Sequence, residues 1–416
     1  MADQLRRAPA VLLSLTLLLT AAAGYPDVQS RPLVATREGI VRGVARRSAA
    51  GGLFFGFKGI PYARAPLGPL RFQPPQRHPG WADVLDGLKH GRTCLQYNAF
   101  KSNSLEGDED CLFANVYTPQ LPALERAVGG LPVMVFIHAG GFTMGSGDEE
   151  IYGPNYFMDE AVVLVTFNYR LGSFGFFTTR DKNAPGNYGL LDQVMLLQGV
   201  RDNIARFGGD PATVTVFGTS AGGASVSLLV LSPLAKGLFH HAISQSAIGD
   251  RVFVVPMSEE VRLASLHAPV YKYVLDYRGP GRLSPAELFG IDAPIIDPSH
   301  GDDLVYLFSN AKQAAYPADS PTYTMIRFMV SLWTSFARTG RPSSTVLPTP
   351  DWPVFTEHSQ RHMRLNAEPS VGERLFDERV RFWQSVRINE AWRHEVQTSC
   401  LPNGAEYGAR RRRSAP

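Results

Sequence analysis

A serine stands at the boundary between two expected elements of secondary structure. Val214-Thr-Val-Phe217 is an apolar run typical of a buried strand, and the stretch from Ala224 to Leu231 is typical of a helix. Between them lies Gly218-Thr-Ser220-Ala-Gly222, the pattern G-x-S-x-G. A Cβ at either glycine would collide with a neighbouring strand or helix, so the turn pushes the serine hydroxyl out at the carboxyl edge of a sheet. Ser220 is therefore the candidate nucleophile.

A glycine turn after another apolar run could assist such a serine. Attack on an ester carbonyl places negative charge on the carbonyl oxygen, and backbone N–H groups without obstructing side chains stabilise it. The segment His138-Ala-Gly140-Gly141-Phe142 follows the apolar run 133–138 and supplies a turn of this kind. The alternative is a plain glycine turn without a chemical role.

The serine also needs a base, and ten histidines are available. His300 stands in a polar loop, Asp297-Pro-Ser-His300-Gly-Asp-Asp303, on the C-terminal side of Ser220. The alternative is a solvated loop histidine. The sequence thus offers a serine, a histidine and an N–H turn for nucleophilic catalysis.

The elements around these residues alternate between strands and helices. The apolar runs 133–138 and 162–167 predict buried parallel strands, and the apolar spacing in 187–207 predicts a helix. This order is typical of a doubly wound α/β sheet. Further along, we expect a strand over 270–276, helices over 324–339 and 374–386, and a Pro-rich loop over 341–353. No composition shift marks a second domain.

The composition indicates a globular protein without a polyanionic partner. Hydrophobic residues make up 44% of the 416 residues and charged residues 19%, which excludes a disordered chain. The net charge of +3 is concentrated at the two ends, so the fold itself implies no nucleic-acid partner. The apolar run of the N-terminal segment is too short to span a bilayer, and no other apolar run is long enough to be an integral membrane segment.

The N-terminal segment 1–23 has the features of a secretory signal peptide. Arg6 and Arg7 precede a short apolar run that ends in three alanines, so the mature chain is expected to start near Gly24 and to be secreted. A buried N-terminal helix is the alternative. The basic tail 401–416 contains Arg410-Arg-Arg-Arg413, which could be a proprotein-convertase site, a solvated basic end or the product of an alternative reading frame.

The chain has three cysteines, and disulfide bonds between cysteines persist in the oxidising compartment that secretion implies. A bridge between Cys94 and Cys111 would close a short loop and stabilise the fold by about 3 kcal/mol. Cys400 would then be unpaired. It could form an intermolecular disulfide, its partner cysteine could be missing from the chain, or it could be a buried free thiol.

Several further blocks resemble the type-B carboxylesterase and cholinesterase family. The resemblance is nearly unbroken up to Ser246 and continues in separate blocks after it. The blocks are 59–63, 66–72, 109–117, 138–142, 168–172, 186–193, 203–222, 237–246, 300–308, 333–342 and 351–353.

The resemblance implies an α/β-hydrolase fold and a two-step acyl transfer to water through an acyl-serine. Ser220 would be the nucleophile and His300 the general base and acid. The N–H groups of Gly140, Gly141 and Ala221 would form the oxyanion hole, and Cys94 with Cys111 matches the family's first disulfide. A small-molecule carboxylic ester would be the substrate, with no cofactor and no metal, while the particular ester and the oligomeric state stay open.

The chain departs from the family between Ser246 and Gly249. The family carries more than about one hundred additional residues at this place, including the catalytic Glu, a second disulfide and helices that roof the gorge. Asp276, Asp292 and Asp297 are the nearest acids before His300, and each is read more simply as a solvated residue. Thr219 also stands where the family usually has Glu.

We therefore expect the hydrolase domain 24–400 to be incomplete between 246 and 249 and its activity to be impaired. A splice variant, an incomplete gene model and a lineage that has lost catalysis would each explain the gap. The alternatives to an ester hydrolase are a catalytically inactive, cholinesterase-like binding or adhesion protein and a non-functional splice isoform.

Overall fold

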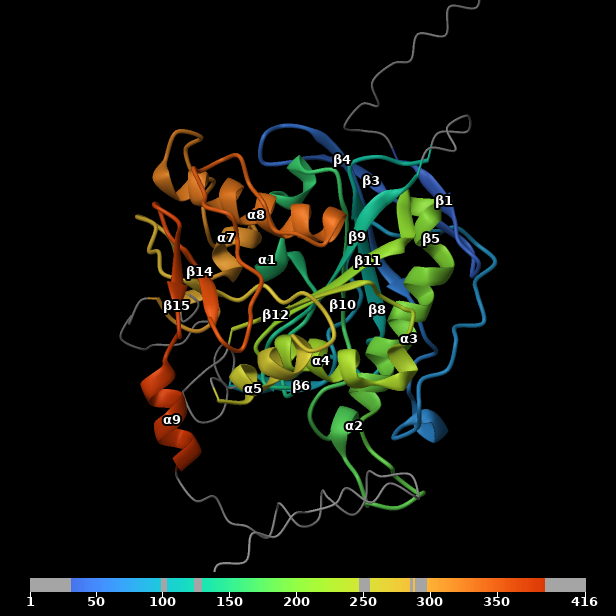
Figure 1. Cartoon of the computed structure of the whole chain (residues 1–416). Helices are drawn as coiled ribbons and strands as arrows, with labels where there is room; N and C mark the ends of the chain where they lie inside the picture. The colour runs from blue at the N-terminus through green and yellow to red at the C-terminus, as the bar shows by residue number, and fades with distance from the viewer. Residues whose placement is uncertain are drawn as a thin grey trace, which may run out of the picture.

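A central seven-stranded sheet organises the molecule (Figure 1). The computed structural model describes residues 31–98, 103–122, 129–246, 255–284, 287–288 and 298–385. The strand order is β12-β11-β9-β10-β8-β4-β3. The strands are β3 (Val44–Arg47), β4 (Leu53–Pro61), β8 (Phe113–Thr118), β9 (Leu131–Ile137), β10 (Val163–Phe167), β11 (Gly209–Thr219) and β12 (His241–Gln245).

The sheet is parallel in one half and antiparallel in the other. Strands β12, β11, β9 and β10 run parallel to one another, whereas β10, β8, β4 and β3 are joined by antiparallel pairings. The parallel half contains the apolar runs from which the α/β class was predicted. The antiparallel half makes the described sheet mixed, so the expectation of a mostly parallel sheet holds only for the half that carries the glycine turns.

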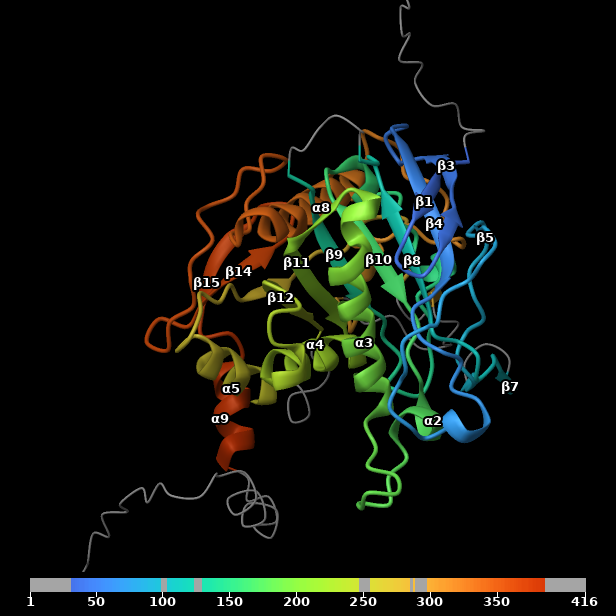
Figure 2. The same ribbon diagram turned by 90° about the vertical axis from the view of Figure 1, so that its right-hand side faces the viewer.

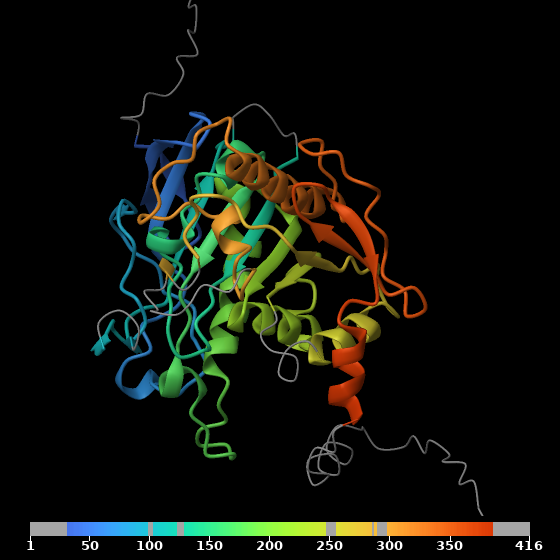
Figure 3. The same ribbon diagram turned by 90° about the vertical axis from the view of Figure 1, so that its left-hand side faces the viewer.

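Alternating side chains of the central strands build two separate cores. In β9, Val133, Val135 and Ile137 belong to one buried cluster, and Met134 and Phe136 belong to the other. This alternation follows from the two-residue period of a strand. Helices α3 (Tyr188–Asn203) and α4 (Ala221–Leu231) cover the first face (Figure 2), and α7 (Leu304–Leu307) and α8 (Pro321–Thr339) cover the second (Figure 3).

Helix α8 shows how the sequence sets the ends of an element. The Ser320 hydroxyl accepts a hydrogen bond from the N–H of Tyr323, and Pro321 occupies the first turn, where its missing N–H costs nothing. Gly340 ends the helix with φ 70°, a conformation that glycine adopts without strain. The helix predicted over 324–339 is confirmed, and it buries Met325, Phe328, Met329 and Leu332 on one face.

Smaller elements surround this central structure. The strand predicted over 270–276 is present but shorter, as β13 (Tyr273–Leu275), and the helix predicted over 374–386 is α9 (Asp377–Ser385). The stretch 341–353, predicted as a loop, contains neither helix nor strand. The proposed signal peptide, Cys400 and the basic tail 401–416 lie outside the described residues. The remaining elements are β1 (Leu33–Ala35), β2 (Ile40–Arg42), β5 (Leu85–Asp86), β6 (Gln96–Asn98), β7 (Ser104–Glu106), β13 (Tyr273–Leu275), β14 (Arg361–Leu365), β15 (Ser370–Glu373), α1 (Glu149–Tyr152), α2 (Gly172–Phe176), α5 (Val255–Ala264), α9 (Asp377–Ser385) and the short 3₁₀ turns η1 (Gly68–Leu70), η2 (Phe157–Asp159), η3 (Ile204–Phe207) and η4 (Pro233–Ala235).

Candidate active site

Ser220 occupies the turn between β11 and α4. Its backbone angles are φ 59° and ψ −121°, and such strained conformations cost about 1–3 kcal/mol and cluster at functional sites. The flanking glycines have no room for a side chain. A Cβ on Gly218 would lie 2.6 Å from the carbonyl carbon of Gly222, and one on Gly222 would lie 2.0 Å from the carbonyl oxygen of Ile137. The prediction that this turn requires both glycines is confirmed.

The glycine turn after β9 starts at the same edge of the sheet. Gly218 of β11 pairs with Ile137 of β9, so the loop 138–142 leaves the sheet beside the serine turn. Gly140 has φ 119°, and a Cβ there would lie 1.9 Å from a backbone carbonyl oxygen of the same loop. Within the described part of the chain, the N–H groups of Gly140 and Gly141 donate to no other group. They are available to an oxyanion.

Ala221 is the first residue of α4. The first N–H groups of a helix have no partner within the helix and lie at the positive end of its dipole. Ala221 N–H therefore stands directly after Ser220 at the end of a helix that favours negative charge. The resemblance assigns Ala221 as the third donor of an oxyanion hole, and this role stays a prediction.

His138 holds the glycine turn against the sheet. Its ring stacks on that of Tyr169, with centroids 4.4 Å apart and planes 19° apart, and Tyr169 donates to the His138 carbonyl oxygen at 3.2 Å. Nδ1 of His138 lies 2.7 Å from the carbonyl oxygen of Ala139, and burial lowers the pKa of the ring to about 4. The imidazole is therefore neutral at pH 7. Sequence reasoning missed Tyr169, because nothing near it in sequence indicates its contact with His138.

His300 lies in a loop that a buried ion pair anchors. Asp302 binds the guanidinium of Arg282 at 2.9 Å and accepts the N–H of Ser299 at 2.7 Å. Both side chains of the ion pair are only 2% exposed. Burial also lowers the pKa of His300 to about 4, so this imidazole is neutral at pH 7 and has the protonation state of a base.

The hydroxyl of Ser246 meets His300. Oγ of Ser246 lies 2.8 Å from Nδ1 of His300 and accepts the N–H of Gly301, also at 2.8 Å. Ser246 directly follows β12, as Ser220 directly follows β11, and the preceding residues Thr219 and Gln245 pair across these parallel strands. The structure thus brings Ser220, Ser246 and His300 to one edge of the sheet. The sequence contains Ser246 in a recognised block, but gives no signal that its hydroxyl contacts a histidine.

The acids near His300 in sequence have different positions. Asp276 forms an ion pair with Arg364 at 3.3 Å, and both side chains are 47% exposed, as expected of a solvated residue at a strand end. Asp292 and Asp297 lie outside the described residues. Thr219 is buried at the end of β11, and its hydroxyl has no hydrogen-bond partner in the described part of the molecule.

The carboxyl group of Asp303, three positions after the candidate base His300, is buried. Asp303 accepts hydrogen bonds from the side-chain amide of Gln245 at 2.6 Å and from the hydroxyl of Tyr273 at 3.1 Å. Burial is the main cause that raises the pKa of Asp303. These contacts bind the loop of His300 to the ends of β12 and β13, and sequence reasoning did not identify them.

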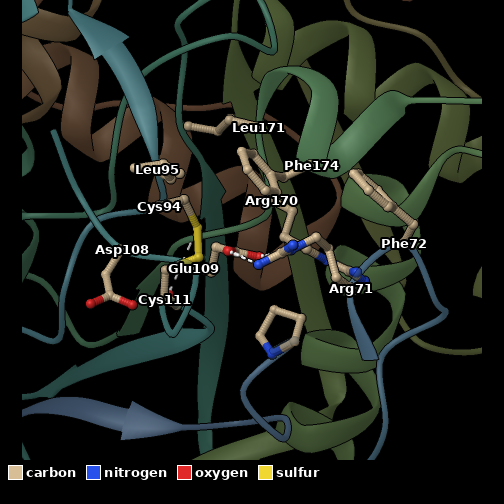
Figure 4. A pocket seen from close by; sticks show the side chains of 11 residues that line it. Arg71, Phe72, Cys94, Leu95, Asp108, Glu109, Cys111, Arg170, Leu171 and Phe174 are labelled. Carbon is tan, nitrogen blue, oxygen red and sulfur yellow. Dashed lines mark hydrogen bonds and ion pairs between the residues drawn. A yellow bond between two sulfur atoms is a disulfide. The ribbon is translucent and has the colours of Figure 1, made fainter. Parts of the chain in front are cut away.

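Cys94 and Cys111 form a disulfide, as the resemblance implies. A hollow lies beside it (Figure 4). An ion pair between Arg71 and Glu109 crosses this hollow, and the rings of Phe72 and Phe174 line it. Neither Ser220 nor His300 lines this hollow, so it is separate from the candidate active site.

The chain matches a known protein family over most of its length. Residues 30–249 and 246–383 match the sequence model of the carboxylesterase family. The chain belongs to the carboxylesterase family. The two matched segments overlap at residues 246–249. The sequence predicts that a stretch of the family is missing at this place, and this absence stays a prediction.

Two curated relatives illustrate the extent of the match. This carboxylesterase-family chain is 49% identical over 230 residues to juvenile hormone esterase of Tribolium castaneum, covering 55% of the chain and 38% of the relative. It is 48% identical over 216 residues to cocaine esterase of Oryctolagus cuniculus, covering 49% of the chain and 40% of the relative. The chain spans less than half the length of these relatives.

The fold has a counterpart among solved structures. The crystal structure of juvenile hormone esterase from Manduca sexta, with OTFP covalently attached, superposes with a TM-score of 0.77 at 23% identity, covering 86% of this chain and 99% of that one. The expected α/β-hydrolase fold is confirmed. None of the helices in the described ranges is long and apolar enough to cross a membrane. In the same ranges, no group of three or more His, Cys, Asp or Glu side chains could hold a metal ion.

Proposed function

We propose that this member of the carboxylesterase family is a carboxylic-ester hydrolase that acts through an acyl-serine at Ser220. The observation that carries the proposal is the convergence of three groups at one sheet edge. They are the strained serine turn, the glycine turn whose N–H groups have no acceptor within the described residues, and the loop of His300 joined to the end of β12. Family membership supports the same reaction class.

In the first step, the Ser220 oxygen attacks the ester carbonyl carbon while His300 takes the hydroxyl proton. The carbonyl π electrons move to oxygen, where the N–H groups of Gly140, Gly141 and Ala221 stabilise the negative charge. The tetrahedral intermediate then breaks its bond to the alcohol oxygen, which receives the proton from His300. An alcohol leaves, and the acyl group stays on Ser220.

In the second step, water attacks the acyl carbon and His300 takes its proton. Collapse of the second tetrahedral intermediate releases the carboxylic acid and returns the proton to Ser220. The protein groups in this scheme belong to the serine turn, the glycine turn and the loop of His300. We further propose that turnover is slow, because the family's Glu has no counterpart in the residues that the sequence places around His300.

The proposal is tested by labelling of Ser220 with a fluorophosphonate probe, followed by mass spectrometry of the labelled peptide. We expect slow labelling of wild-type protein at Ser220, faster than at an exposed serine such as Ser370. Ser220→Ala should abolish it, and His300→Gln should slow it by about 10² or more. Circular dichroism and a cooperative melt establish folding for each protein. A folded wild type that leaves Ser220 unlabelled contradicts the proposal.

We also propose that the chain is secreted after removal of residues 1–23. The signal-like segment and the disulfide between Cys94 and Cys111 support this, since disulfides persist in oxidising compartments. Expression in a eukaryotic secretion host, followed by N-terminal sequencing of protein in the medium, should give a chain that starts near Gly24. A chain that stays in the cell with Met1 intact contradicts secretion.

A further inference from the structure

We propose that a hollow beneath helix α3 binds a small, neutral aromatic molecule that carries a hydrogen-bond donor. This hollow, which we call the α3 hollow, lies between α3 and the sheet face formed by β4, β8 and β10, and residues of the turn between β1 and β2 stand at its mouth. Figure 2 shows α3 in front of the sheet. Neither Ser220 nor His300 lines the α3 hollow, so the inference goes beyond the proposed ester hydrolysis and does not depend on it.

One face of α3 forms the outer wall of the α3 hollow. Four residues at the i, i+3, i+4, i+7 spacing of a single helix face line it: Leu196, Gly199, Val200 and Asn203. Gly199 contributes no side chain at the middle of this face. A Cβ placed there would meet nothing within 4 Å. The space that a side chain at position 199 would fill is therefore open.

The inner walls of the α3 hollow are apolar. Six of the lining side chains belong to the first buried cluster and are at most 6% exposed: Val116, Val165, Leu196, Val200, Ile204 and Phe207. The free space between the walls is about 530 Å³ with the open mouth included, whereas a water molecule takes up about 30 Å³ of the liquid. Apolar walls offer water no hydrogen-bond partners, so an apolar molecule the size of several waters is the favoured occupant.

Most polar groups at the mouth of the α3 hollow are bound to other groups of the protein. Nδ2 of Asn203 donates to Oε2 of Glu38 at 3.0 Å, and Oδ1 of Asn203 accepts the N–H of Arg37 at 2.9 Å. The hydroxyls of Thr36 and Tyr62 donate to backbone carbonyl oxygens, at 2.8 and 2.7 Å. These groups fix the shape of the mouth and leave the carboxylate of Glu38 to meet a ligand.

The carboxylate of Glu38 would select the kind of ligand. Among the described residues, Oε2 receives a hydrogen bond from Asn203, and no basic side chain forms an ion pair with Glu38. An ionised carboxylate only accepts hydrogen bonds, so it favours a ligand that donates one. Three arginine side chains pair with Asp202, the residue before Asn203. Because positive charge is already gathered there, a neutral donor is favoured over a cation.

Indole is the probe, because it is neutral and apolar and carries one N–H. Calorimetric titration of the full chain should give a Kd of roughly 0.1–1 mM, as is reasonable for a ligand of this size. N-Methylindole has nearly the same shape without the donor and should bind about three- to tenfold more weakly. In Glu38→Ala the two compounds should bind equally. Ser220→Ala should bind indole like wild type, so failure of the proposed hydrolysis would leave this result unchanged.

Two substitutions at one position isolate the filling of the α3 hollow. Alanine and leucine both favour a helix interior over glycine, so Gly199→Ala and Gly199→Leu should each raise the melting temperature. The leucine side chain should also occupy the hollow and weaken indole binding at least about tenfold. Gly199→Ala adds a single methyl group and is the matched control, with a Kd changed less than about threefold.

Three results would overturn the inference. Wild type could bind no indole up to the solubility limit, or Gly199→Leu could bind it as tightly as Gly199→Ala, which would place the bound molecule elsewhere. Equal binding of indole and N-methylindole to wild type would contradict the role of Glu38. If Gly199→Leu does not fold, the methyl NMR signals of Val116 and Val165 decide, since both side chains line the hollow. Indole should shift these signals in wild type, and unchanged signals contradict the site.

Discussion

The backbone N–H of Ser220 donates to the carbonyl oxygen of Gln245 at 3.1 Å, so the serine turn is hydrogen-bonded to the end of β12. The side-chain amide of Gln245 donates at the same time to Asp303, at 2.6 Å, in the loop that carries His300. One residue therefore contacts both loops of the candidate active site. The relative position of the candidate nucleophile and base depends on this last residue of β12 as well as on their own loops.

Gly222→Ala should disrupt the serine turn. A Cβ at this position would lie 2.0 Å from the carbonyl oxygen of Ile137, a backbone atom that belongs to the central strand β9. The strand or the helix start must move, so we expect a loss of roughly 2–4 kcal/mol in unfolding free energy and a loss of Ser220 labelling. Urea unfolding and probe labelling measure the two effects.

Gly199→Ala is the matched control for that change. Gly199 lies inside α3, and a Cβ there would meet nothing within 4 Å. Because alanine favours a helix interior over glycine by about 1 kcal/mol, this variant should be more stable than wild type and should label normally. Equal destabilisation by the two alanines would show that Gly222 is not confined by β9.

The sequence was informative where a local pattern determines a local conformation. The parallel strands, the turn at Ser220 and most of α8, predicted over 324–339, follow from apolar runs and glycines within a few residues of one another. The start of α8 at Pro321, after the capping Ser320, was not predicted. The antiparallel half of the sheet could not be predicted in this way, because strand pairing depends on contacts between segments far apart in sequence.

The same distinction applies within the candidate site. Ser220 and the glycine turn have local signals, whereas Ser246 and His300 are brought together by the pairing of two strands and by a loop from much later in the chain. Arg282 is a further example, since it anchors the His300 loop from a segment without any recognised motif. Side-chain contacts across the fold leave no periodic pattern in the sequence.

Arg282→Gln should loosen the loop of His300. The guanidinium binds Asp302 at 2.9 Å, both side chains are 2% exposed, and the substitution takes this positive charge away from a buried carboxylate. Breaking a buried pair of this kind costs about 3–5 kcal/mol. We expect an unfolding free energy lower by about that amount and slower labelling of Ser220.

Arg364→Gln tests whether burial is responsible. Arg364 also pairs with an aspartate, Asp276, at 3.3 Å, but both side chains are 47% exposed. An exposed pair contributes at most about 1 kcal/mol, so stability and labelling should stay near the wild-type values. Asp276→Asn should likewise leave labelling unchanged, and a strong loss there would identify Asp276 as a catalytic acid after all.

The labelling rate of Ser220 should depend on pH through His300. Burial lowers the pKa of this imidazole to about 4, and only the neutral ring can accept the serine proton. The rate should therefore change little from about pH 8 to pH 5 and fall near pH 4, whereas an unperturbed histidine would lose half its activity near pH 6.5. A midpoint near 6.5, with the fold intact by circular dichroism, would show that His300 is not buried as described.

The same lowered pKa has a consequence for stability. The unfolded chain binds a proton at this histidine near pH 6.5 and the folded chain only near pH 4, so protonation favours the unfolded state between these values. The contribution of His300 to the unfolding free energy should be complete above about pH 6.5 and decrease as the pH falls towards 4. In His300→Gln, urea unfolding at several pH values should show a smaller decrease over this range.

Removal of the disulfide should lower stability without abolishing the candidate site. Cys94 and Cys111 are separated by 17 positions, and opening a loop of this length costs about 3 kcal/mol by the chain-entropy estimate. The double variant Cys94→Ser, Cys111→Ser should therefore unfold at lower urea concentration. Ser220 should still be labelled, because the bridge lies beside the Arg71 hollow and not at the serine turn. Reduction of wild type with dithiothreitol should reproduce the shift in the urea midpoint, and the double variant should not respond to the reductant. A midpoint shift of similar size in the reduced double variant would mean that the reductant acts elsewhere than on this bridge.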